Sequence, residues 1–237
     1  MKAYLRSNFG WLARCMIRAV DPWARLSYAQ EGEDVLLDRL LAKQEKGFYV
    51  DVGAHHPKRF SNTHYFHMRG WRGINIEPNP TVHDLFRKMR SRDVNLQLGI
   101  SDQPGELLYY EFDDPALNTF DEQLMRERES STPYRVIATR RIKVEPLAAV
   151  LAAHLPSGQS IDFLSVDVEG LDLNVLRSND WERFRPRCVV SEALNAGLAP
   201  AVLAGNPLLA YMEAQQYSLT AKTCNSWFFL DVRMTKA

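Results

Sequence analysis

The chain has 237 residues, of which 46% are hydrophobic and 24% are charged, a composition typical of a globular protein with one large domain. Lys plus Arg and Asp plus Glu both number 29, so the basic excess of a nucleic-acid-binding protein is missing and we expect no nucleic-acid partner. No apolar run reaches the roughly 18 residues of a membrane-spanning helix, so none is expected. Three widely spaced cysteines without a CxxC motif indicate buried free thiols in a reducing, cytoplasmic compartment: Cys15, Cys188 and Cys224.

Residues 1–27 form a basic extension, in which Lys and Arg are interleaved with aromatic and aliphatic residues and Asp21 is the single acid. Arginines interrupt any signal-peptide core, and no small-residue cleavage site follows. Two interpretations stay open. The segment is either an amphipathic helix that packs on the domain or on a second subunit, or a basic interfacial helix at the inner face of an anionic membrane. Residues 28–237 are interpreted as one domain.

From residue 31 onward, the hydrophobic pattern alternates between helical and strand periods. A predicted helix over 31–44 leads into the apolar run 48–50, which is typical of a buried parallel strand and delivers Asp51, followed by Gly53 and Ala54. Further helices are predicted over 63–69, 80–90, 146–154, 171–176 and 200–216. Further strands are predicted over 72–76, 93–99, 106–112, 161–166, 187–191, 217–221 and 227–232.

Residues 113–140 are the least regular part of the sequence. They are polar and charged, and they contain Pro115, Pro133 and a Ser-Ser-Thr cluster at 130–132. A loop of this length inside a compact domain is usually functional or mobile. We interpret the segment as a lid or an acceptor-binding insertion.

Strands that alternate with helices predict an α/β fold, with a parallel sheet covered by helices on both faces and the last pair of strands antiparallel at one edge. Ligands of such sheets bind outside the carboxyl ends of the strands. Polar or acidic residues follow each of the first five strands there: Asp51, Glu77, Ser101, Asp102, Asp167, Glu169 and Glu192. Their accumulation at one edge predicts a ligand site.

The residue types at this edge discriminate between nucleotide ligands. An acid that ends the second strand, Glu77, can hold a ribose diol by two hydrogen bonds. A GxGxxG pattern, which would admit a pyrophosphate, is replaced by Gly53, His55 and Lys58, and acidic surroundings favour a cation over a phosphate. S-adenosylmethionine, which joins adenosine to a positive sulfonium, meets both requirements. The predicted cofactor-binding residues are Asp51, Gly53, Ala54, Glu77, Asp167, and Ser101 with Asp102 facing the adenine.

Several segments together resemble one known family, the FkbM methyltransferases: YAQEGEDVLL (28–37), FYVDVGAHHP (48–57), SNTHYF (61–66), GWRGINIEPNP (70–80), GISD (99–102) and IDFLSVDVEG (161–170). The resemblance runs from about residue 28 to the C-terminus. It implies the class I methyltransferase fold, a Rossmann-like seven-stranded sheet that is mostly parallel with its last strand antiparallel. It also implies S-adenosylmethionine-dependent O-methylation, often of sugars or polyketide-type natural products. The chain departs from many members at His55-His56-Pro57, where a second glycine is common.

Methyl transfer to a hydroxyl needs a base or a metal ion to take the proton, because a hydroxyl is a poor nucleophile. Asp167 and Glu169 are predicted beside the methyl position, and i, i+2 spacing in a strand places both carboxylates on one side. Together with Glu192 they offer three oxygen donors for Mg²⁺. Alternatively, Asp167 or Glu169 is the base, or one of them holds the amino group of the cofactor. His56, or its neighbour His55, is a further candidate base or acceptor contact.

Our hypothesis is a cytoplasmic S-adenosylmethionine-dependent O-methyltransferase with a small-molecule or glycan acceptor, such as a sugar or secondary-metabolite hydroxyl. Two alternatives stay open. One is a nicotinamide-dependent oxidoreductase on a Rossmann sheet, against which the missing glycines weigh. The other is a non-catalytic, methyltransferase-like module that tethers a complex to the membrane through residues 1–27. The intact acids at positions 51, 77, 167 and 169 argue against lost activity.

Overall fold

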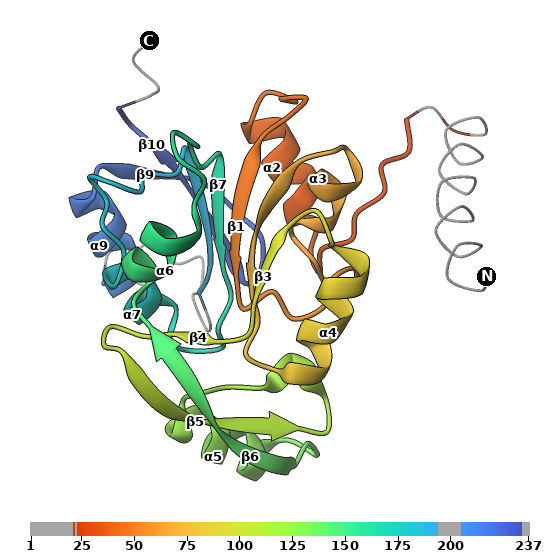
Figure 1. Ribbon diagram of the computed structural model, residues 1–237, viewed down its shortest axis with the longest axis vertical. Coiled ribbons are helices and arrows are strands. Elements are labelled where there is room, and N and C mark those ends of the chain that lie inside the picture. The colour runs from red at the N-terminus through yellow and green to blue at the C-terminus, as the bar shows by residue number, and fades with distance from the viewer. Residues whose placement is uncertain (1–20, 22, 194–204, 234–237) are drawn as a thin grey trace.

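Seven strands form the central sheet, in the order β3-β2-β1-β7-β8-β10-β9 (Figure 1). The computed structural model describes residues 21, 23–193 and 205–233. The strands of this sheet are β1 (Phe48–Val52), β2 (Arg72–Ile76), β3 (Val94–Leu96), β7 (Phe163–Val166), β8 (Cys188–Glu192), β9 (Tyr217–Lys222) and β10 (Ser226–Asp231).

The predicted GFYVDVGA strand lies in the middle of the sheet. β1 pairs in parallel with both β2 and β7, so that Val50 is level with Ile74 on one side and Leu164 on the other. All of its residues are buried, which is why its sequence is apolar apart from Asp51. At the far edge β10 runs antiparallel to both β8 and β9. The fold class is confirmed: the sheet is mostly parallel and its last strand is antiparallel.

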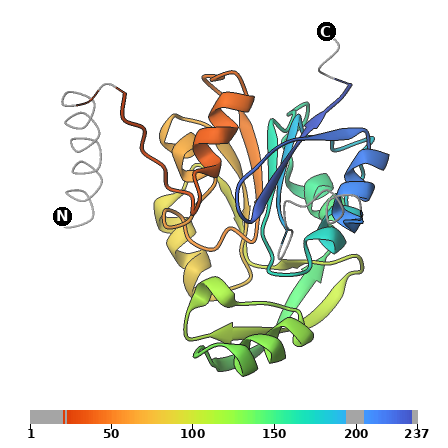
Figure 2. The same cartoon turned by 180° about the vertical axis from the view of Figure 1, so that it is seen from behind.

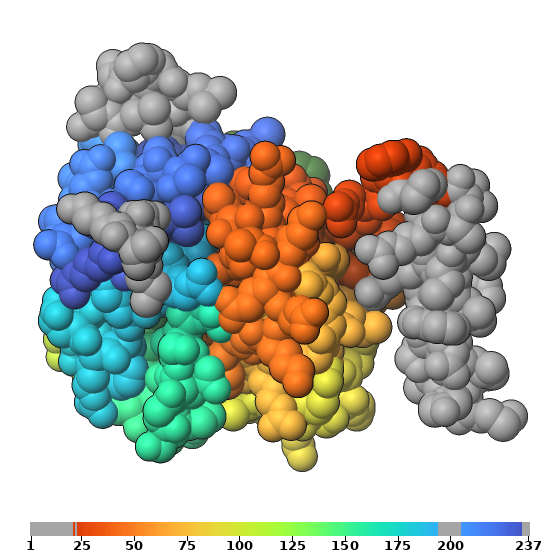
Figure 3. Space-filling model, turned by 90° about the horizontal axis from the view of Figure 1, so that it is seen from above, coloured from red at the N-terminus to blue at the C-terminus, as the bar shows by residue number. Residues whose placement is uncertain are grey.

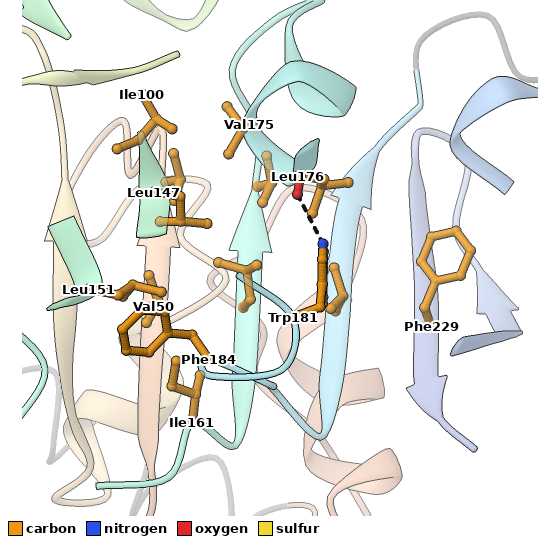
Figure 4. Close-up of a cluster of buried hydrophobic side chains, with 14 of the residues drawn as sticks. Val50, Ile100, Leu147, Leu151, Ile161, Val175, Leu176, Trp181, Phe184 and Phe229 are labelled. Carbon is orange, nitrogen blue, oxygen red and sulfur yellow. Dashed lines mark hydrogen bonds between the residues drawn. The ribbon is translucent and has the colours of Figure 1, made fainter. Parts of the chain in front are cut away.

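Helices cover both faces of this sheet. One face packs against α6 (Leu147–His154), α7 (Asp172–Arg177) and α9 (Pro207–Ala214), and the other against α2 (Glu33–Leu40) and α3 (His64–Met68). Alternation along β1 sends Val50 into the first core and Tyr49 into the second. Figure 4 shows the first core, where Trp181 donates its indole N–H to the carbonyl of Leu176 at 3.2 Å.

α4 (Pro80–Met89) and α9 both begin with an Asn-Pro pair, and the Asn side chain of each pair accepts backbone N–H groups of the first turn. Two predicted helices, over 200–216 and over 31–44, have different ends in the structure. The predicted helix over 200–216 therefore begins later, at Pro207, while residues 200–204 lie outside the described residues. The predicted helix over 31–44 ends early, at Leu40, because Ala42 and Lys43 have positive φ angles.

A small sheet lies beyond the carboxyl ends of the main strands, and the sequence interpretation missed most of it. Its order is β4-β6-β5, with β4 (Gly99–Ile100), β5 (Gly105–Phe112) and β6 (Val136–Glu145). The segment 113–140, interpreted as irregular, contains the 3-10 helix η1 (Pro115–Leu117), the helix α5 (Glu122–Ser131) and the start of β6. The predicted strand over 93–99 is likewise divided, because Gly99 pairs with β6 instead of continuing β3. Figure 2 shows this layer below the main sheet.

Figure 3 shows the end of the molecule opposite the small sheet, where the orange residues around 33–50, which include α2, lie between the C-terminal half of the chain and the gold and yellow residues. Of the predicted basic extension, residues 1–20 and 22 lie outside the described residues. Among the residues that the structure describes, none of the helices has the length and apolarity to cross a membrane. Cys188 is buried as predicted, whereas Cys224 is exposed; Cys15 lies outside the described residues.

Candidate active site

A cavity opens at the carboxyl ends of β1, β2 and β7, between the main sheet and the small sheet. Its empty volume, counted out to open solvent, is about 980 Å³. The cavity therefore lies at the edge of the sheet where the sequence predicts a ligand. Its walls come from residues 51–55, 60–62, 77–79, 98–100 and 167–169, with Pro115, Ala116, Asn118 and Phe120 from the segment after β5.

Gly53 sets the spacing between the ends of β1 and β7. Its φ is +76°, and a Cβ built on it would lie 1.8 Å from the carbonyl oxygen of Asp167. Its N–H and that of Ala54 both donate to the carbonyl of Ile76, at 3.0 and 3.2 Å. The close neighbour that requires a glycine here is the chain's own backbone at the end of β7.

Glu77 is a buried carboxylate at the end of β2. Its Oε2 accepts the backbone N–H of His55 at 2.9 Å, and its Oε1 accepts that of Asn79 at 2.8 Å. Burial raises the pKa of Glu77 to about 8, because the ionised form loses its hydration. Each carboxylate oxygen can accept more than one hydrogen bond. Glu77 therefore shapes the 53–55 turn and still offers acceptor positions to a ligand in the cavity.

Asp51 lies inside β1, where it forms one wall of the cavity. The hydroxyl of Thr63 donates to its Oδ2 at 2.7 Å, and Ser165 of β7 is its register partner. Burial raises the pKa of Asp51, while Thr63 and the nearby charge of Arg90 oppose the rise. Asp51 is therefore held between the cavity and a buried polar network around Arg90.

The two adjacent histidines face different surroundings. His55 lines the cavity, its ring stacks on that of Phe60 with centroids 6.2 Å apart, and its buried Nε2 has no hydrogen-bond partner among the described residues. Burial lowers the pKa of His55 to about 4. His56, the predicted catalytic candidate, is not among the lining residues, and its Nδ1 accepts the backbone N–H groups of Lys58 and Arg59. The structure therefore brings His55, not His56, to the cavity.

Three carboxylates converge beyond the ends of β7 and β8. Oxygen atoms of Asp167, Glu169 and Glu192, the three predicted metal ligands, all lie within 4.8 Å of one another. Glu169 forms an ion pair with Arg128 of α5. The Oε2 of Glu192 is buried without a partner among the described residues, and burial and its acidic neighbours raise its pKa to about 11.

Asp167 is open to the cavity, but the protein walls around it and the neighbouring Glu169, Asp172 and Asp51 raise its pKa well above the usual range. The sequence interpretation did not single out Asp172, at the start of α7. Its carboxylate accepts the N–H groups of Val168 and Gly170, each at 3.3 Å. Asp172 thereby closes the turn that carries the other acids.

The predicted adenine contacts lie away from the cavity walls. Neither Ser101 nor Asp102 is a lining residue; Ser101 hydrogen-bonds Asp102 at 3.2 Å instead. The preceding residues Leu98, Gly99 and Ile100 do line the cavity. So do Tyr109, Asn118 and Phe120, which no periodic pattern in the sequence indicates.

A mostly parallel seven-stranded sheet with a cavity at the carboxyl ends of its strands is the architecture of the class I methyltransferases, which use S-adenosylmethionine. The sequence model of the Methyltransferase FkbM domain matches residues 51–219, which is more than half of the chain. The protein belongs to the FkbM methyltransferase family. A comparison with curated proteins gives no match. The family match supports the methyltransferase interpretation over the nicotinamide-dependent oxidoreductase.

Seventeen chains of known structure match the fold. The METTL16 MTase domain is 12% identical with a TM-score of 0.43, and the match covers 83% of this chain and 64% of that one. A TehB-like SAM-dependent methyltransferase from Corynebacterium glutamicum is 10% identical with a TM-score of 0.42, covering 95% and 98%. An O-methyltransferase from Bacillus cereus in complex with SAH is 11% identical with a TM-score of 0.39, covering 91% and 86%.

The residues around the cavity fit the cofactor of this class. Glu77 offers carboxylate oxygens to a diol, and the unpartnered Nε2 of His55 lies in the same wall. Leu98, Ile100 and Phe120 supply apolar surface for a planar base. The acids at the ends of β1, β2 and β7 favour a cationic ligand over a phosphate.

Proposed function

We propose that the protein is an O-methyltransferase whose acceptor is a hydroxyl of a sugar, a glycan or a secondary metabolite. The observation that carries this proposal is the position of Asp167, a carboxylate with a raised pKa that is open to the cavity. A hydroxyl must lose its proton as the methyl group arrives. A carboxylate whose pKa is raised is, once ionised, a stronger base than an ordinary aspartate.

Each wall of the cavity has a part in this proposal. S-adenosylmethionine, when bound, supplies an electrophilic methyl group on a positive sulfonium. Glu77 accepts hydrogen bonds from the ribose, and Asp51, Gly53 and Ala54 form the wall beside it. Asp167 accepts the proton of the acceptor hydroxyl at a carboxylate oxygen. The remaining task of the protein is to align the two reactants, which is the larger part of catalysis for an in-line displacement.

Substitution of Asp167 tests the base. We expect Asp167→Asn to bind S-adenosylhomocysteine with nearly wild-type affinity, because the amide keeps the size of the side chain. Transfer of a labelled methyl group to the accepted substrate should fall by about 100-fold or more, the usual contribution of a general base. Because the acceptor is unknown, methyl transfer is first screened over a panel of monosaccharides, glycans and polyketide alcohols. Wild-type rates in Asp167→Asn would refute the assignment.

A Mg²⁺ ion held by Asp167, Glu169 and Glu192 is an alternative way to activate the hydroxyl, and the spacing of their oxygens allows it. Arg128 competes with the ion, because it already pairs with Glu169. Calorimetric titration with MgCl₂ decides between the two. Saturating heat in the wild type that disappears in Glu192→Gln would establish the ion, whereas heats equal to those of dilution would remove it.

The proposed partners are assigned to the cavity and to the basic segment 1–27. The cavity holds a small-molecule or glycan acceptor in the cytoplasm, and residues 1–27 contact an anionic membrane surface or a second copy of the chain. Trp23, at the edge of this extension, is 88% exposed. Sedimentation with anionic vesicles, with and without residues 1–27, tests the membrane contact. Light scattering of the same two proteins tests self-association.

A further inference from the structure

The segment 115–131 rests directly on the acidic turn that follows β7. The hydroxyl of Thr119 donates to the carbonyl of Glu169 at 2.8 Å. A Cβ built on Gly170 would lie 3.1 Å from the Cδ2 of Leu124 in α5, so the turn and the helix are in close contact. Glu169 and Gly170 both have positive φ angles, +55° and +104°. This turn thus has a specific backbone shape against which α5 and Thr119 pack.

Arg128 makes one bond across this contact and one within its own segment. One terminal nitrogen forms an ion pair with the Oε2 of Glu169, and the other donates to the carbonyl of Leu117 at 2.8 Å. The side chains of Arg128 and Glu169 are only 12% and 18% exposed, so the ion pair is largely shielded from solvent. By contrast, Arg126 and Glu122 on the same helix form an ion pair whose side chains are 73% and 58% exposed, where little stabilisation is expected.

We propose that Arg128 is a positioning residue of the active site. By holding both Glu169 and Leu117, it fixes the wall of the cavity formed by Pro115, Ala116, Asn118 and Phe120. By neutralising Glu169, it also leaves Asp167 as the carboxylate that meets the ligand. The segment 115–131 then forms one wall of the binding site, and Arg128 holds it against the turn that follows β7. This inference rests on the proposed function, because the ligand of the wall is the one assigned there.

The test compares four proteins: the wild type, Arg128→Glu, the charge-swapped double variant Arg128→Glu with Glu169→Arg, and Arg126→Glu as the control on the same helix. Hydrogen exchange of the amides in 115–131 reports docking and needs no ligand. Calorimetry with S-adenosylhomocysteine measures the affinity of the cavity for this ligand. We expect Arg128→Glu to speed exchange in this segment by at least about 10-fold and to weaken binding by a similar factor, because one partly buried ion pair is lost. Exchange in β1 and β7 should not change.

The double variant separates positioning from a general loss of structure. It should recover most of the exchange protection and of the affinity, whereas Arg126→Glu should match the wild type in both. The proposal is overturned if Arg128→Glu leaves binding unchanged, or if the double variant is no better than the single one. Should Arg128→Glu not fold, Arg128→Gln replaces it and is rescued instead by Glu169→Gln. Absence of binding to the wild type would count against the proposed function and leave the exchange result to be judged alone.

Discussion

At the scale of single residues, position 53 accepts only glycine. A Cβ there would lie 1.8 Å from the Asp167 carbonyl, and φ is +76°. We expect Gly53→Ala to lower the free energy of unfolding by about 3 kcal/mol, from the clash and the left-handed backbone together, and to abolish cofactor binding. Urea unfolding measures the loss.

Two other glycines serve as controls for this prediction. Gly70→Ala adds a side chain at φ +94° with nothing within 4 Å, so it isolates the backbone strain, about 1 kcal/mol. Gly105→Ala meets neither constraint and should leave stability unchanged or slightly raised. A Gly53→Ala variant no less stable than Gly70→Ala would contradict the steric account.

The adjacent histidines give a second prediction at this scale. We expect His55→Asn to weaken binding of S-adenosylhomocysteine about 3- to 10-fold, the effect of losing one ligand hydrogen bond; Asn tolerates the positive φ of 51° at this position. His56→Asn should bind normally and lose at most about 1 kcal/mol of stability, because its Nδ1 serves the local loop. Calorimetry and thermal melting of both variants distinguish the roles, and a larger binding defect in His56→Asn would reverse the assignment.

At the scale of elements, Arg90 joins the end of α4 to the loop after β1. Its guanidinium is fully buried and donates to the carbonyl of Pro57 at 3.0 Å, to the hydroxyl of Tyr49 at 2.9 Å and to that of Ser61 at 3.1 Å. It lies 3.6 Å from the buried Asp93. We expect Arg90→Met to cost about 3–5 kcal/mol, because it leaves that carboxylate without its guanidinium. Urea unfolding against Arg87→Met, an exposed arginine on the same helix, checks this; equal stabilities would disprove it.

How far the sequence predicts an element depends on whether that element buries a regular face. β1, β2, β7 and β8 are buried along nearly their whole length, so their apolar runs are readable. α5 has no buried residue, so its sequence carries no helical period and it was interpreted as loop. The ion pair of Arg128 with Glu169 joins residues 41 positions apart, and no local pattern encodes such a contact. The acids at strand ends were therefore predictable, whereas the wall that faces them was not.

At the scale of the whole molecule, buried carboxyls make stability depend on pH. Burial raises the pKa of Glu77 from 4.5 to about 8, and that of Asp172 from 3.8 to about 7. At a pH between the unfolded and the native pKa of each carboxyl group, the native state binds more protons than the unfolded chain. The free energy of unfolding therefore falls as pH rises from about 5 to about 8. Asp93 and Asp231 have lowered pKa values, so they change the free energy of unfolding only in more acidic solution.

Chemical unfolding at pH 5.5, 7 and 8.5 measures this dependence. We expect the wild type to lose several kcal/mol across the range, and Glu77→Gln to lose clearly less, because the amide does not ionise. A wild-type stability that rises with pH would contradict the raised pKa values.

The central claim is that this acidic cavity binds S-adenosylmethionine through Glu77. Calorimetric titration of the cofactor into the wild type and into Glu77→Gln tests it most directly. The predicted result is saturable one-to-one binding by the wild type, with affinity about 10- to 100-fold weaker in the variant, the effect of losing the hydrogen bonds that the Glu77 carboxyl group makes to the ribose. No saturation of the wild type at millimolar cofactor, or equal affinities in the two proteins, would contradict it.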